Sequence, residues 1–92
     1  MIQASAVSAR SYHRVAVDMT DSQNFEDALT AIDQAIILQQ NNPLLLVDKS
    51  LILKQLDRNF EAQRVYDRAL AIDFNYVTSL VESEAYQPLE EL

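Results

Sequence analysis

The chain has 92 residues, 49% of them apolar and 23% charged, which is typical of one small globular domain and not of a disordered chain. Seven Lys and Arg residues against 14 Asp and Glu give a net charge of −7, which disfavours binding to a nucleic-acid phosphate backbone. No apolar run is long enough to span a membrane, glycine is absent, and the lack of cysteine excludes disulfides and favours a cytoplasmic location.

Capping residues and apolar spacing predict five helices joined by short polar links. Asn24 and Asn59 each precede carboxylates that would lie in a first helical turn, Asn42 precedes Pro43, and Asn75 is the expected cap of the last helix. Short links place consecutive helices antiparallel. The expected elements, in chain order, are a frayed segment at 1–8, helices at about 9–22, 25–39, 43–56, 59–73 and 76–86, and an acidic tail at 87–92.

The second and fourth predicted helices repeat one pattern of small and large residues. The segment that begins at Asn24 matches the segment that begins at Asn59 once one residue is dropped after Asn-Phe-Glu. The matching residues then lie 34 positions apart and follow the spacing of one helix face: Ala28, Ile32 and Ala35 in the first copy, and Ala62, Tyr66 and Ala69 in the second. The spacing predicts two helical hairpins, at about 9–42 and 43–75, and a capping helix.

A 34-residue helical hairpin with this alanine pattern resembles the tetratricopeptide repeat, over roughly residues 9–86. The resemblance implies an all-α fold in which antiparallel hairpins stack into a right-handed superhelix. It also implies a non-catalytic protein-interaction module that binds a peptide or helix of a partner in a concave groove, lined by the first helix of each hairpin. The chain departs from the family at the turn within each hairpin, where Gln23 and Asp57 replace the usual glycine.

Carried over by this alignment, the groove draws residues from three helices. We expect Leu46, Ser50 and Leu53 to face the core, which leaves neighbouring apolar residues for the groove. The predicted groove residues are Arg10, His13, Val17, Thr20 and Asp21, then Leu44, Val47, Leu51, Lys54 and Gln55, then Thr78, Val81 and Ala85, with Arg14 and Asp48 at the rim. An apolar groove flanked by arginine and lysine predicts a partner segment that carries acidic residues.

Other interpretations of the same residues remain open. The same apolar face of the third helix could instead close a homodimer, or pack under the last helix. An ordinary helical bundle and an RNA-binding helical repeat are further alternatives, although the negative charge disfavours the second. His13 is the one histidine and no nucleophile or second metal ligand accompanies it, so we expect no enzyme activity, no metal and no cofactor.

Overall fold

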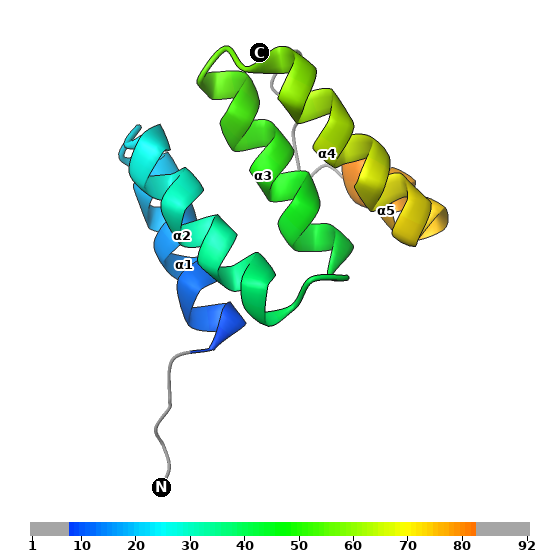
Figure 1. Cartoon of the computed structure of the whole chain (residues 1–92), viewed down its shortest axis with the longest axis horizontal. Helices are drawn as coiled ribbons and strands as arrows, with labels where there is room; N and C mark the ends of the chain where they lie inside the picture. The colour runs from blue at the N-terminus through cyan, green and yellow to red at the C-terminus, as the bar shows by residue number, and fades with distance from the viewer. Residues whose placement is uncertain (1–7, 83–92) are drawn as a thin grey trace, which may run out of the picture.

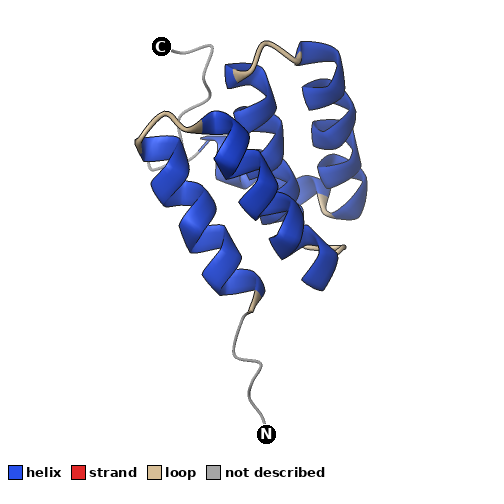
Figure 2. Ribbon diagram, turned by 60° about the vertical axis from the view of Figure 1, so that its left-hand side comes forward, coloured by secondary structure: helices blue, strands red, loops and turns tan. Residues whose placement is uncertain are grey.

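The computed structural model describes residues 8–82, which form five α-helices and no strand, as expected for an all-α fold. The helices are α1 (Ala9–Asp21), α2 (Phe25–Leu38), α3 (Pro43–Gln55), α4 (Asn59–Ile72) and α5 (Phe74–Glu82). Short loops join them, as the ribbon in Figure 2 shows. None of the described helices combines the length and the apolar character needed to cross a membrane.

Consecutive helices pack against one another, and α3 lies in the middle of the molecule. Figure 1 shows α1 and α2 on one side of α3, with α4 and α5 on the other. The helix α5 contacts both α4 and α3, so it covers part of the second hairpin. Because α3 has neighbours on several sides, most of its circumference is buried. This burial determines which of the apolar residues 44–47 remain accessible.

The two hairpin turns have the same backbone geometry without glycine. Gln23 and Asp57 both adopt left-handed conformations, with φ of 64° and 62°. In the first turn the Gln23 amide donates to the Thr20 carbonyl at 2.9 Å and the Asn24 amide donates to the Met19 carbonyl at 2.8 Å. In the second turn the Asp57 amide donates to the Lys54 carbonyl at 3.0 Å and the Arg58 amide donates to the Leu53 carbonyl at 2.9 Å. The helices α1 and α3 therefore both end in a Schellman motif.

The helix bounds of the two hairpins recur with one spacing. The first and last residues of α1 and of α2 precede their counterparts in α3 and α4 by 34 positions throughout (43 − 9 and 59 − 25 at the starts). No residue is dropped between the two hairpins, so Phe25 corresponds to Asn59 and not to Phe60. The predicted alignment of the two Asn-Phe-Glu motifs is therefore wrong by one position. Phe25 consequently packs on the core, whereas Phe60 is 81% exposed.

The predicted helix caps are in part corrected. Asn42 caps α3 as expected, since its Oδ1 accepts a hydrogen bond from the Leu44 amide at 3.0 Å. Asn24 occupies the cap position of α2 but makes no side-chain capping bond. Asn59 is the first residue of α4, and the cap position belongs to Arg58.

The last helix begins two residues earlier than predicted. Asp73, not Asn75, caps it, because Asp73 Oδ1 accepts a hydrogen bond from the Tyr76 amide at 3.0 Å. The chain start also differs from the prediction at one residue: Ser8 caps α1 through a hydrogen bond from the Ser11 amide at 3.2 Å. The rest of the predicted frayed segment, the predicted last turn at 83–86 with Ala85, and the predicted tail at 87–92 lie outside the described residues.

Small residues at the helix crossings let the backbones approach closely. Ala28, Ile32 and Ala35 are fully buried in a cluster that joins the first hairpin to α3 and α4. A second cluster contains Leu46, Val47, Ala69 and Val77 and lies under α5. The three residues predicted to face the core, Leu46, Ser50 and Leu53, are all buried. The Ser50 hydroxyl donates to the Val47 carbonyl at 2.6 Å, so this buried polar group is satisfied.

Candidate binding groove between α1 and α3

A groove of about 310 Å³ lies between α1 and α3, the first helices of the two hairpins. We call it the α1–α3 groove. Its lining is His13, Ala16, Val17, Thr20 and Asp21 from α1, Ile32 from α2, and Leu44, Asp48, Leu51 and Ile52 from α3. Most of these side chains are apolar, and Ala16, Ile32 and Ile52 are buried at its base. Such a surface favours apolar side chains of a ligand, with a few polar groups to orient them.

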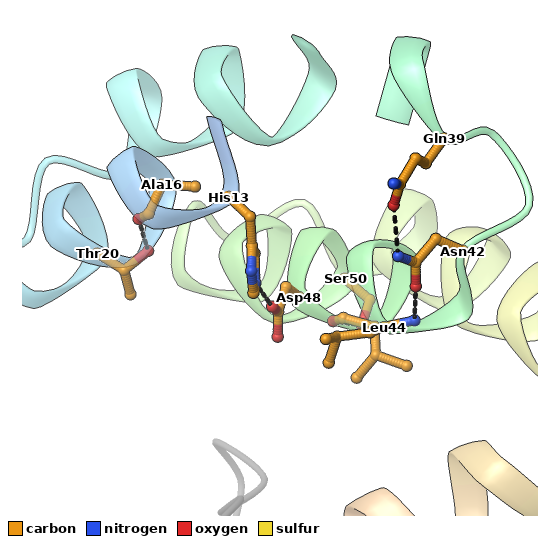
Figure 3. Close-up of polar contacts among 9 residues, drawn as sticks. His13, Ala16, Thr20, Gln39, Asn42, Leu44, Asp48 and Ser50 are labelled. Atoms are coloured by element: carbon orange, nitrogen blue, oxygen red, sulfur yellow. Dashed lines mark hydrogen bonds and ion pairs between the residues drawn. The ribbon is translucent and has the colours of Figure 1, made fainter. Parts of the chain in front are cut away.

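The spacing of the lining residues follows from helix geometry. Leu44, Asp48 and Leu51 lie three or four residues apart on α3, so they share one face of that helix. On α1, the lining runs from His13 to Asp21, which spans about 12 Å at 1.5 Å per residue. The Thr20 hydroxyl donates to the Ala16 carbonyl at 2.8 Å, so its hydrogen is used within α1 (Figure 3).

His13 and Asp48 join the two hairpins across the groove. In Figure 3 the His13 ring points from α1 toward α3, where its Nε2 meets Asp48 Oδ2. The side chains are 24% and 17% exposed, so the pair is largely shielded from solvent. The hydrogen bond to Asp48 raises the pKa of His13 above 6.5, burial opposes this, and the negative charge of Asp48 adds to the increase.

A second ion pair connects the hairpins from the next residue of α3. Lys49 Nζ lies 2.8 Å from Asp33 Oδ1 on α2. Residues 48 and 49 thus bind α1 and α2 respectively, which fixes α3 against both helices of the first hairpin. Lys49 and Asp33 are more exposed together than His13 and Asp48, so we expect this pair to contribute less to stability.

The structure brings several of the predicted groove residues together. His13, Val17, Leu44 and Leu51 line the α1–α3 groove, and Val17 is 44% exposed there. Thr20, Asp21 and Asp48, which the alignment also placed at the groove or its rim, belong to the same lining.

The prediction for Val47 is wrong. Val47 is 1% exposed and packs with Leu46, Ala69 and Val77, so no partner can reach it. The reason is that α4, through Ala69, and α5, through Val77, both cover this side of α3. One alternative left open by the sequence, packing under the last helix, therefore holds for Val47 and not for Leu44. It holds in part for Leu51, which lines the groove and also packs against the cluster that contains Val47 and Val77.

The remaining predicted groove residues lie elsewhere. Arg10, Arg14 and Gln55 are exposed, Lys54 is half-buried, and none of the four is among the described residues that line the α1–α3 groove. Val81 packs against the second core cluster, and Thr78, half-buried on α5, is also not among the described residues of the groove lining. The basic flank that suggested an acidic partner is thus not part of the groove wall. The ionisable side chains that line the α1–α3 groove, within residues 8–82, are His13, Asp21 and Asp48.

Sequence reasoning missed the base of the groove and the contact across it. Ala16, Ile32 and Ile52 were not predicted to line it, because all three also serve the core. The pairing of His13 with Asp48 has a signal in the sequence, since the two residues lie 35 positions apart, one more than the repeat spacing.

Neither a metal centre nor a relative provides a further guide to the site. Among the residues that the structure describes, no group of three or more His, Asp or Glu side chains is placed to hold a metal ion. No protein-family model matches the chain, and no significant match is found among curated proteins or solved structures.

Proposed function

We propose that this chain is a non-catalytic protein-interaction module that binds an apolar segment of a partner protein in the α1–α3 groove. The observation that carries the proposal is the position of the groove. Apolar side chains from the first helix of each hairpin, among them Val17, Leu44 and Leu51, meet on one accessible surface.

The proposal includes a tetratricopeptide-like architecture. Four helix bounds and both hairpin turns recur 34 residues apart, and the left-handed residues Gln23 and Asp57 occupy the positions where that repeat has glycine. These features support two copies of one hairpin, with α5 as a capping helix. In such repeats neighbouring hairpins bury a continuous core, and the concave side stays free for a ligand.

Affinity capture with matched variants tests the proposal. Leu51→Asp and Val17→Asp each place a carboxylate in the groove, and Ile37→Asp is the control, because Ile37 is exposed on α2 and does not line the groove. Proteins retained by the wild-type chain should be lost with both groove variants and kept with the control, while the helical circular dichroism stays unchanged. Equal retention by folded groove variants would refute the assignment.

A second candidate function is self-assembly, favoured by large apolar side chains outside the groove. Phe60 and Phe74 are both more than half exposed, on α4 and α5, and each offers an apolar side chain for association. Sedimentation velocity at tens of micromolar separates the two functions. A dimer that dissociates on Phe74→Asp, and not on Val17→Asp, would support assembly through Phe74.

A further inference from the structure

The charged residues of the α1–α3 groove restrict the chemistry of its ligand. His13 and Asp48 form a pair, so their charges largely compensate each other when His13 is protonated. Asp21 is the remaining ionisable residue of the described lining, and it is exposed at the end of α1. The wall of the groove therefore carries a net negative charge beside its apolar base.

The charge of the whole chain acts in the same direction. With a net charge of −7, the molecule attracts cationic segments and repels acidic ones over roughly the Debye length of 8–10 Å. Arg10 and Arg14 lie 11 and 7 residues before Asp21 on α1, about 16 and 10 Å away along the helix axis. Neither they nor Lys54 on α3 belong to the described groove lining, in which Asp21 is the one exposed charge.

We propose that the α1–α3 groove takes an apolar segment that carries a lysine or arginine, and that Asp21 receives this cation. The proposal rests on the function proposed above and specifies its ligand. The apolar side chains of the segment cover Val17, Leu44 and Leu51, and the cation lies toward the C-terminal end of α1, where Asp21 is placed. About 12 Å of groove accommodates two turns of a helix.

Selection from a displayed library of random peptides on the full chain tests this ligand class. Peptides that depend on Leu51 should be enriched in large apolar residues together with lysine or arginine. For one such peptide, Asp21→Lys should weaken binding about two- to fivefold, and raising the salt should weaken the wild-type complex. Asp18→Lys is the matched control, because Asp18 lies on the same helix with the same charge and does not line the groove.

Each outcome bears on a different statement. Leu51-dependent peptides without basic residues, or with equal effects of the two lysine substitutions, would overturn the proposed ligand and leave the binding function intact. An absence of Leu51-dependent peptides, with the variant folded by circular dichroism, would overturn both. Val17→Asp repeats the comparison in case Leu51→Asp fails to fold, since Val17 is the more exposed of the two.

Discussion

Replacing Gln23 with glycine should stabilise the protein, although glycine is ordinarily a destabilising choice. Gln23 has a φ of 64°, where the Cβ of a non-glycine residue is strained by about 1–2 kcal/mol. Glycine removes that strain, but it also gives the unfolded chain more freedom, which costs about 0.4–1 kcal/mol. The balance predicts a gain of roughly 1 kcal/mol for Gln23→Gly, which corresponds to about 4–8 °C in Tm for a domain of this size.

The second turn provides an internal comparison. Asp57 has nearly the same φ, but aspartate tolerates this conformation better than glutamine. Its side chain also accepts a hydrogen bond from Asn59 Nδ2 at 3.3 Å, which Asp57→Gly would remove. We therefore expect a smaller gain at this turn, about half of that at Gln23. Because the turns belong to different hairpins, the two gains should add.

Urea and thermal denaturation of both variants measure the effect, with Gln40→Gly as the control. Gln40 is an exposed turn residue and is not among the described residues with positive φ, so glycine there should lower the free energy of unfolding by about 0.5 kcal/mol. If Gln23→Gly proves as destabilising as Gln40→Gly, the left-handed turn geometry, and the comparison with the glycine of the repeat family, would be refuted.

Four further changes test the core, the cross-groove pair and the last cap. Val47→Asp should unfold most of the chain by circular dichroism, because it places an unpaired carboxylate in the core, and a native spectrum would contradict its burial. Ile32→Ala should cost about 2–5 kcal/mol in urea denaturation, since Ile32 is fully buried. The raised pKa of His13 adds stability that is complete below pH 6.5 and declines as the pH rises through the folded-state pKa. Urea midpoints should therefore fall from pH 6 to pH 8.5, less so in His13→Gln. Asp73→Ala should cost about 1 kcal/mol and speed amide exchange in α5, without equal change in α1.

Much of the fold follows from the sequence because its helices carry local signals. The ends of α1 to α4 were predicted to within one residue from polar links and capping residues. The start of α5 was not, since Asp73 and Asn75 are both good caps and the choice depends on how α5 packs on α4. Local capping signals do not show that tertiary preference.

The error at Val47 has a different physical origin. Residues 44–47 are all apolar, so α3 lacks the alternation that would tell one face from another. Leu44 lines the groove while Val47 is buried, and the difference arises because α4 and α5 both cover the side of α3 that carries Val47. The repeat alignment placed His13 and Asp48 near the groove, but their contact depends on the relative rotation of two helices.

The contacts of the consecutive residues Asp48 and Lys49 restrict the rotation of α3 about its own axis. Neighbouring residues project about 100° apart around a helix, so a roll of α3 that preserves the contact with α1 strains the contact with α2, and the reverse. We therefore expect these two contacts to hold the α1–α3 groove in one shape, so that the proposed ligand would spend little binding energy on reshaping it. Because salt screens exposed charge pairs most strongly, high ionic strength should weaken the contact between Lys49 and Asp33 before the contact between His13 and Asp48.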